Sequence, residues 1–436
     1  MEQLELFTGT ENLFEELCSI HLLKQGFKAV KRNGGSPGID GTTTADFGAR
    51  LEEEVAQLRK ELVSWSYTPQ PVRRVEIPKP GGNGTRLLGV PCVRDRVVQA
   101  SLVILLEPTF DPEFSEHSYG FRPGKNQRQA VESAQRIVQK GKEHVVDIDL
   151  SKFFDRISHD RLIERMKTKV KDKRILRLVG LTLRSGVMTH GSILPTTEGT
   201  TQGSPLSPLL SNIVLDELDK ELERRGLEFC RFADDCNIFT GSVKAAERVM
   251  QNVTKFIEQR LKLVVNQEKS KVARSGHIKF LGMTIVAGTI AISVISMSRA
   301  MDKVKELTPR GTHLPIEKSI AEINLWYRGW SEYFSMTQYP NQLAVIEAHL
   351  RRRLRSRMVD QMKQPRNVAA KLIARGVSRR LSYSTAYSNK GRWALSHTLA
   401  VERAYPNKWF VKMGFFTKSD KELSHWYPVS RRIKMV

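Results

Sequence analysis

The chain has 436 residues, more than one ordinary hydrophobic core can organise, so we expect two or three domains. A hydrophobic fraction of 40% is enough for packed interiors, while 70 Lys and Arg against 47 Asp and Glu give a formal charge of +23. That excess favours a polyanion such as nucleic acid as the partner, ahead of an anionic membrane surface. The longest apolar run, Leu102 to Leu106, is far below the ~20 residues of a membrane span. The N-terminus is acidic and the four cysteines form no zinc-binding pattern, so we expect a soluble, cytoplasmic protein with inert thiols.

In chain order, the sequence predicts interleaved helices and strands up to about residue 295 and helices from there on. The predicted helical stretches are 1–70 with a loop at 33–38, 93–141 with an interruption at 108–124, a stretch ending near 185, 205–225 and 243–261. The predicted strands are a hairpin at 71–91, a strand at 144–150, and two strands at 227–232 and 236–240. The helical pattern after 295 breaks near 310, 364 and 405. This order predicts an α/β or α+β core followed by a helical, strongly basic C-terminal extension.

Two adjacent carboxylates, Asp234 and Asp235, lie at the tip of the hairpin predicted for 227–240. Two unit charges ~4 Å apart repel by about 4 kcal/mol at an effective dielectric near 20, so either water screens them or cations hold them. Because Asp is a common turn residue, a solvated turn explains the pair when it is considered alone. A third carboxylate, Asp149, ends the predicted strand 144–150, where an ordinary helix cap is an equally good explanation.

If the strands that carry these carboxylates are neighbours in one sheet, the three side chains meet at one end of it. Such a group needs hard cations, and Mg²⁺ prefers a few carboxylates together with water and substrate phosphates. Two such ions about 4 Å apart can activate a 3′ hydroxyl and stabilise a leaving pyrophosphate.

Two cations, Lys79 and Arg86, flank the glycine-rich turn of the hairpin at 71–91. Arg can bind a triphosphate bidentately while Lys acts as a point charge, although a solvated basic hairpin is the simpler interpretation of this feature alone.

The stretch 199–208 leads into a predicted helix whose N-terminus suits a phosphate or a base pair, and by itself it is only a loop and a helix start.

The order and spacing of these blocks resemble reverse transcriptases encoded by group II introns, particularly the compact bacterial type without an endonuclease. The matching blocks are at 38–41, 74–80, 88–91, 118–123, the Asp149 strand, 202–203, 231–235, 266–271 and 280–282. Any one block is weak evidence, but the ordered set is specific, and it covers about residues 30–335 and, more weakly, the tail. The resemblance implies an α+β right-hand polymerase. Its fingers and palm, with an antiparallel sheet, would span 1–295, its helical thumb or maturase domain 296–360, and a basic DNA- or RNA-binding region 361–436.

By the same resemblance, the catalytic carboxylates are Asp149, Asp234 and Asp235, and they hold two Mg²⁺ ions together with the backbone carbonyl of Leu150. The residues of the dNTP site would be Lys79, Arg86, Phe154, Gln202 and Lys269. Phe154 would block a ribose 2′ hydroxyl and so favour dNTPs, and core packing explains it as well. Lys269 would protonate the pyrophosphate, although a charged loop residue is the simpler interpretation. The grip on the primer terminus would be Phe280, Leu281 and Gly282.

Three residues depart from the pattern of the family. Thr201 stands where Pro is usual, Ser204 where a second Gly is common, and Phe232 where Tyr is commoner. We expect bulk at Ser204 to alter the pocket beside the templating base. None of the three changes touches a carboxylate, so the polymerase interpretation stands.

The basic C-terminal third begins with an aromatic helix. Trp326, Trp330 and Phe334 recur at i, i+4 and i+8, which predicts the core of a helix bundle. Farther on, a predicted helix has an apolar stripe along one side. Its other sides carry a cluster of arginines that we expect to contact phosphate, namely Arg351, Arg352, Arg353, Arg355 and Arg357. No zinc-finger or HNH-type pattern follows, so the region is expected to bind DNA or RNA without an attached endonuclease.

Three functions remain open at this point. The first is an RNA-directed DNA polymerase that binds its group II intron RNA, supports splicing and retrohoming, and extends a DNA primer on an RNA template with dNTPs. The second is a non-catalytic splicing maturase, which the presence of all three carboxylates disfavours. The third is a domesticated or defence-associated relative that polymerises without an intron, and the catalytic blocks do not separate it from the first.

Overall fold

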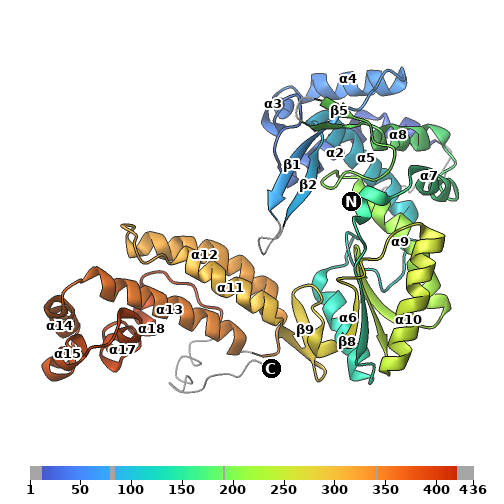
Figure 1. The fold of residues 1–436 in the computed structure, drawn as a ribbon. Helices are drawn as coiled ribbons and strands as arrows, with labels where there is room; N and C mark the ends of the chain where they lie inside the picture. The colour runs from blue at the N-terminus through green and yellow to red at the C-terminus, as the bar shows by residue number, and fades with distance from the viewer. Residues whose placement is uncertain (1–11, 79–83, 190–191, 340, 420–436) are drawn as a thin grey trace, which may run out of the picture. The chain divides into compact units, whose positions relative to one another are not determined.

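The computed structural model describes residues 12–78, 84–189, 192–339 and 341–419 (Figure 1). The chain divides into two compact units, Met1–Ile278 and Lys279–Val436, each built around its own hydrophobic core. In the described parts of the chain, no helix combines the length and the apolarity that crossing a membrane requires.

The first unit begins with helices that pack around a small mixed sheet. The helices are α1 (Leu13–Leu17), α2 (Ile20–Asn33), α3 (Thr44–Ala49), α4 (Leu51–Val63) and α5 (Val93–Phe110). The sheet has the strand order β2-β1-β4-β5, with bounds β1 (Val72–Pro78), β2 (Thr85–Val90), β4 (Val187–Thr189) and β5 (Ser192–Leu194). β1 and β2 form an antiparallel hairpin, as the sequence predicts, and β4 pairs with β1 in parallel.

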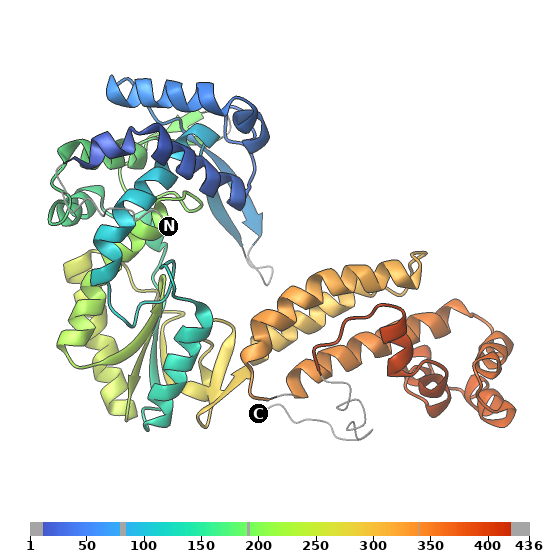
Figure 2. The same cartoon turned by 180° about the vertical axis from the view of Figure 1, so that it is seen from behind.

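The second sheet of this unit is antiparallel throughout and has the order β6-β7-β3-β8. Its strands are β3 (His144–Ile148), β6 (Glu228–Phe232), β7 (Asp235–Thr240) and β8 (Lys271–Arg274). The helices that contact it are α6 (Gln127–Gln139), α9 (Ser207–Arg224) and α10 (Val243–Phe256). Helix α7 (His159–Lys167) packs on α9 and on α8 (Lys173–Leu183). Both views show α9 and α10 on one side of the sheet and α6 on the other (Figures 1 and 2). The chain order β3-α9-β6-β7-α10-β8 is therefore a β-α-β-β-α-β unit.

Burial along the strands explains why this sheet forms the centre of the first unit. In β3, Val145, Val146 and Ile148 are all buried, and because successive strand residues point to opposite faces, β3 is covered on both faces. Helix α10 begins where the Ser242 side chain accepts a hydrogen bond from the Ala245 amide, a regular N-cap. The helix is strongly amphipathic and packs on β3, β7 and β8. One face of the sheet is therefore covered by a capped helix across β3, β7 and β8.

The second unit starts with the hairpin β9 (Met283–Val286) and β10 (Thr289–Ile292) and continues as a helical bundle. Its helices are α11 (Val294–Leu307), α12 (Ile316–Tyr333), α13 (Asn341–Gln361), α14 (Pro365–Ala374), α15 (Arg379–Ala386), α16 (Arg392–Leu395), α17 (Leu399–Ala404) and α18 (Asn407–Lys412). The predicted aromatic core is confirmed, since Phe334 is buried and Trp326 and Trp330 pack against the apolar cluster. Tyr327, which the i, i+4 pattern did not select, is fully buried.

The structure also contains elements that the sequence did not predict. Between α8 and α9, where the sequence predicts no strand, the structure contains β4 and β5. Each has three residues, too few to show the alternation of polar and apolar side chains that identifies a strand. The helix predicted for 243–261 ends as an α-helix at Phe256 and closes with a π-helical turn, Ile257–Leu261.

Close packing of α2 on α5 gives a first test of the fold. A Cβ atom on Gly26 would lie 2.2 Å from Ser101 Oγ and 2.6 Å from the Val97 carbonyl oxygen. We expect Gly26→Ala to lower the free energy of unfolding by about 1–3 kcal/mol, the usual effect of overpacking. Urea unfolding followed by circular dichroism measures it.

Gly180→Ala in α8 is the matched control. Its Cβ would meet only Arg184 Nη1 at 3.8 Å, an ordinary contact. Replacing a helical Gly by Ala should then stabilise the protein by about 0.5–1 kcal/mol. Equal stability changes in the two variants would contradict the close approach of α2 and α5.

Candidate active site

The site is built on the turn between β6 and β7. Phe232 pairs with Asp235, so Ala233 and Asp234 alone make the turn. Ala233 has φ = 57°, in the left-handed region that costs a residue with a Cβ about 1–2 kcal/mol. The surrounding structure must therefore hold this turn in place.

The fully buried side chain of Arg231 holds the turn between β6 and β7 in place. The Arg231 Nη1 group donates to the Ala233 carbonyl at 2.9 Å and to Asn212 Oδ1 at 3.0 Å. Arg231 Nε donates to Asp219 Oδ1 at 2.7 Å, and the Nη2 group donates to the second Asp219 oxygen and to Ser118 Oγ. Neither Arg231 nor Asp219 is exposed to solvent. Burial raises the pKa of the Asp219 carboxyl, and the Arg231 guanidinium opposes that rise.

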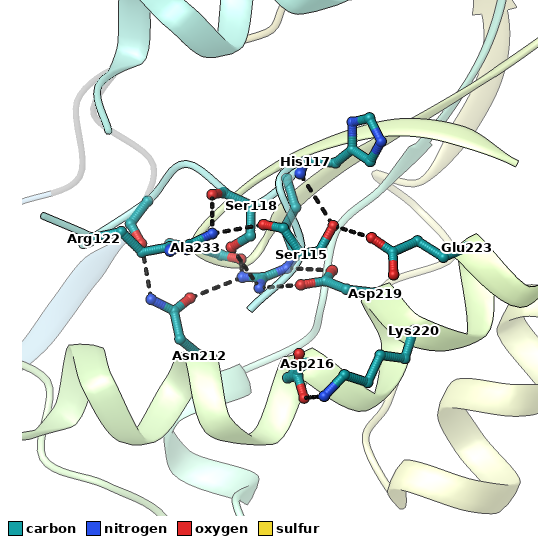
Figure 3. Close-up of polar contacts among 12 residues, drawn as sticks. Ser115, His117, Ser118, Arg122, Asn212, Asp216, Asp219, Lys220, Glu223 and Ala233 are labelled. Atoms are coloured by element: carbon teal, nitrogen blue, oxygen red, sulfur yellow. Dashed lines mark hydrogen bonds and ion pairs between the residues drawn. The ribbon is translucent and has the colours of Figure 1, made fainter. Parts of the chain in front are cut away.

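Two distant segments meet at this arginine: Asn212 and Asp219 come from α9, and Ser118 comes from the loop after α5. Figure 3 labels these three residues together with Ala233. The loop also pairs with β6 through backbone bonds from the Arg231 amide to His117 and from the Tyr119 amide to Arg231, each 2.9 Å long. A Cβ on Gly120 would lie 2.3 Å from the Ala233 amide nitrogen. The block 118–123 thus packs directly behind the turn.

Sequence reasoning missed Asn212 and Asp219. With Asp216 between them, they recur at i, i+4 and i+7 on α9, a polar stripe that is typical of a solvated helix face. The structure buries all three residues. Periodicity gives the face on which a polar residue lies, and it does not show whether water or another segment covers that face.

Asp149 lies at the same end of the sheet as the turn. β3 and β7 are neighbours, as expected, and their pairing ends at Ile148 opposite Cys236, so Asp149 is the first residue beyond the ladder. Its amide donates to Ser270 Oγ at 3.0 Å, and its carbonyl accepts from the Asn266 amide at 2.8 Å. Two residues on, the Ser151 amide donates to the Val264 carbonyl, so the backbone is fixed on both sides of Leu150.

The electrostatics of this end of the sheet are set by two carboxylates and three cations. Burial raises the pKa of the Asp234 carboxyl and the Asp149 charge raises it further, whereas a backbone hydrogen bond and the guanidinium groups of Arg86 and Arg231 oppose the rise. Lys269 Nζ lies 3.8 Å from Asp149 Oδ1, and its side chain is 64% exposed. Two carboxylates with flanking, accessible cations form a site that suits a metal-bound anion.

The side chains that could hold a metal ion at this end of the sheet are carboxylates. Within 12–78, 84–189, 192–339 and 341–419, no three His, Cys, Asp or Glu side chains form a metal-binding group. Asp149 and Asp234 interact, while Asp235 is an exposed residue at the start of β7. Carboxylate and carbonyl oxygens are the ligands that Mg²⁺ prefers, and it completes its shell with water and substrate phosphates. The residues present fit such an ion chemically, and the three-carboxylate site remains a prediction.

The predicted dNTP residues come from separate segments. Lys79 lies outside the described residues, whereas Arg86 is exposed on β2. Phe154 belongs to the 3₁₀ turn Phe153–Arg156, is half-buried against the core and contacts the Phe153 ring edge-on. Its carbonyl accepts from the Thr200 amide, which ties this turn to the segment that leads to Gln202.

Gln202 lines a cavity of about 550 Å³ between the β1–β2 hairpin and residues 196–202. The Gln202 carbonyl accepts from the Gly89 amide at 2.9 Å, and Gly203 adopts φ = 111°, a conformation that favours glycine. Thr201 also lines the cavity, whereas Ser204 does not. The Ser204 hydroxyl is buried and donates to Gln99 Oε1 at 2.8 Å, so its bulk is directed into the core.

The predicted primer-grip residues form a tight turn at the start of the second unit. Phe280 and Met283 exchange two backbone hydrogen bonds of 2.9 Å around Leu281 and Gly282, which both have positive φ. The Leu281 carbonyl accepts from the Tyr333 hydroxyl, and the Gly282 carbonyl accepts from Ser296 Oγ, each at 2.8 Å. The turn is therefore rigidly attached to α11 and α12, and its role toward a primer stays a prediction.

The structure separates the five arginines of α13, which the sequence presents as one basic cluster. Arg351, Arg355 and Arg357 are buried, because α13 lies in the middle of the second unit. Arg355 donates to the Tyr405 carbonyl, and burial lowers its pKa to about 10. Arg352 lies 4.0 Å above the Trp393 ring, and Arg353 donates to the Thr308 carbonyl. All five bind other parts of the unit, so their contact with phosphate stays a prediction.

Comparisons with known proteins agree with this geometry. Residues 77–285 match the family "Reverse transcriptase (RNA-dependent DNA polymerase)", and residues 297–375 match "Group II intron, maturase-specific domain". Protein YkfC of Escherichia coli is 32% identical over 291 residues, which are 58% of this chain and 76% of that protein. The group II intron-encoded protein LtrA of Lactococcus lactis is 34% identical over 221 residues, 51% of this chain and 36% of LtrA.

Among solved structures, the chain is similar to one titled "Partial Cas6-RT-Cas1--Cas2 complex". The sequence identity is 27% and the TM-score 0.37, over 56% of this chain and 42% of that one.

The fold of the first unit and its paired carboxylates define a reverse transcriptase. With the maturase-specific domain that follows, the chain belongs to the group II intron-encoded reverse transcriptases, and it is an RNA-directed DNA polymerase. The α+β fold with an antiparallel sheet is confirmed. Membership implies the use of divalent metal ions and the binding of intron RNA and a nucleic-acid template.

The buried ion pair behind the turn gives a second test. We expect Asp219→Asn to lower the free energy of unfolding by about 3–5 kcal/mol, because the buried Arg231 loses its counter-ion. Thermal unfolding measures the loss, and nucleotide incorporation below the unfolding temperature should fall as well.

Lys220→Gln, next to Asp219 on α9, is the control. Lys220 makes a partly exposed ion pair with Asp216, and such pairs contribute ~0–1 kcal/mol. Equal stability of the Asp219→Asn protein and the wild type would show that the pair does not hold the turn.

Proposed function

We propose that this reverse transcriptase transfers nucleotides with two Mg²⁺ ions, held by Asp149, Asp234 and Asp235 together with the carbonyl of Leu150. When bound, the ions would activate the primer 3′ hydroxyl and neutralise the leaving pyrophosphate. The observation that carries the proposal is the position of Asp234 in a two-residue turn, at the end of the sheet where Asp149 leaves β3; burial and, to a smaller degree, the Asp149 charge raise the Asp234 pKa. Two carboxylates that repel each other in this way are stabilised by a cation between them.

The cations of the site are proposed to bind the incoming dNTP. Arg86, close enough to Asp234 to lower its pKa, would bind the triphosphate from the hairpin side together with Lys79. Lys269, 3.8 Å from Asp149 and exposed, would donate a proton to the leaving pyrophosphate. Phe154 would exclude a ribose 2′ hydroxyl, and Gln202 with Gly203 would line the nascent pair beside the cavity.

The remaining assignments concern domains and partners. We propose fingers and palm for 1–295, a thumb or maturase domain for 296–360 and a DNA- or RNA-binding region for 361–436. A DNA primer would be held by Phe280, Leu281 and Gly282. Support of splicing and retrohoming of an intron follows from the maturase-specific match at 297–375. A cytoplasmic location and a domesticated role without an intron stay predictions from the sequence.

Replacing one carboxylate tests the mechanism. We expect Asp234→Asn to reduce dNTP incorporation on an RNA template by more than about a hundredfold, while RNA binding is kept. Loss of a residue that only orients a metal ligand costs about 10–100-fold, so a larger loss is expected for a direct ligand. Primer extension with Mg²⁺ and a filter-binding assay measure the two quantities. Asp160→Asn, an exposed carboxylate on α7, is the control. Undiminished incorporation by the Asp234→Asn enzyme would contradict the metal site.

The proposed proton donor can be tested separately. We expect Lys269→Met to slow single-turnover incorporation by about a hundredfold, the size of general-acid catalysis, while the dNTP concentration at half-maximal rate changes little. Lys271→Met is the control, since Lys271 Nζ instead approaches the His277 carbonyl at 3.4 Å. If both variants react at the wild-type rate, Lys269 is only a charged loop residue.

A further inference from the structure

Two exposed tyrosines that no core explains lie on α15 and at its end: Tyr383 within the helix and Tyr387 at its C-cap. The side chains of Tyr383 and Tyr387 are 51% and 60% exposed. Their ring centroids are 6.1 Å apart and their planes differ by 22°, so the rings stack on each other in solvent. Large exposed aromatic side chains on one face are typical of a binding surface.

Cations extend this face at both ends. Arg379 and Arg380 lie one helical turn before Tyr383, and Lys390 follows Tyr387 by three residues. All three cations are exposed, and in the part of the chain that the structure describes no hydrogen bond or ion pair engages their side chains. They differ in this respect from the arginines of α13, whose guanidinium groups bind other parts of the second unit.

The surrounding sequence supplies no counter-charge. Residues 361–401 contain eight Lys and Arg and no Asp or Glu, so the local field is positive along the whole stretch. A membrane or an acidic peptide would satisfy the charge, but neither supplies planar groups for a pair of stacked rings.

The opposite face of α15 fixes the helix to the unit. Ser382, Thr385 and Ala386 are buried, and α15 packs on α14 and α17. The two tyrosines are therefore presented by an anchored helix, which keeps the entropy cost of binding low.

We propose that the α15 stripe, formed by Arg379, Arg380, Tyr383, Tyr387 and Lys390, binds single-stranded nucleic acid. Unpaired bases stack on the two tyrosine rings, and the flanking cations contact the adjacent phosphates. A duplex satisfies only the cations, because its bases are already stacked and paired. The inference rests on the proposed nucleic-acid function of the region 361–436 and adds to it the kind of strand and the residues that hold it.

The test compares variants of the full chain in fluorescence anisotropy with three labelled probes: a uridine oligonucleotide, a thymidine oligonucleotide and a DNA duplex. Tyr383→Leu/Tyr387→Leu should weaken binding of single strands about fivefold or more, the size of base–aromatic stacking, and leave the duplex unchanged. Tyr383→Phe/Tyr387→Phe keeps the rings and should bind like the wild type. Tyr339→Leu, at a 40% exposed tyrosine of the same unit, is the matched control.

Salt dependence separates the cations from the rings. Arg379→Gln/Arg380→Gln should make the log–log salt slope for single strands less steep by about 0.7 for each phosphate that is no longer neutralised, whereas the Leu variants should keep the wild-type slope. Crosslinking of a 4-thiouridine oligonucleotide followed by mass spectrometry should identify Tyr383 or Tyr387. The relative affinities for uridine and thymidine probes tell whether the strand is RNA or DNA.

Wild-type affinity of the Leu variants for both single strands, or an equal loss on the duplex, would overturn the proposal. Primer extension with the same preparations distinguishes this failure from that of the polymerase mechanism. If the chain crosslinks through the α15 stripe but does not incorporate dNTPs, the result contradicts the proposed polymerase mechanism and leaves the α15 stripe standing. A chain that polymerises while the Leu variants bind normally contradicts the stripe alone.

Discussion

The buried pair of Arg231 and Asp219 is the interaction on which the catalytic end of the first unit depends. It holds a turn whose Ala233 is in an unfavourable conformation, and that turn carries Asp234. A buried charge pair is rarely the most stable choice, because desolvation offsets much of the attraction. Here the pair fixes geometry. The five N–H donors of Arg231 join β6, α9 and the loop between α5 and α6 at one point, which an apolar side chain could not do.

The second unit shows that a count of charges does not locate a binding surface. The arginines of α13 are the densest basic cluster of the chain, yet three of them are buried. Arginine serves there as a long side chain that satisfies backbone carbonyls and covers aromatic rings, as Arg355 does at Tyr405 and Phe410. Arg379 and Arg380 of α15, by contrast, are exposed beside an exposed tyrosine, and within the described residues no hydrogen bond or ion pair engages their side chains.

Much of the fold could be predicted because its main elements are long and regular. The β1–β2 hairpin, β3, the β6–β7 hairpin, α9 and α10 were all expected within a few residues of their observed ends. β4 and β5 were not, since strands of three residues carry no period. Within the site, Asp149 and Asp234 were identifiable from their blocks, whereas Asn212 and Asp219 resembled a solvated helix face.

The sequence by itself determined the family, the order of the elements and the positions of the carboxylates, because these depend on local pattern and on ordered motifs. Only the tertiary structure decided which polar residues are buried: Asp219 against Arg231, Ser204 against Gln99, and Arg357 against Ser319. It also showed that Asp234 occupies the turn, with Asp235 as the first residue of β7. The physical reason is that burial and partnership arise between segments far apart in the chain, and no local period encodes them.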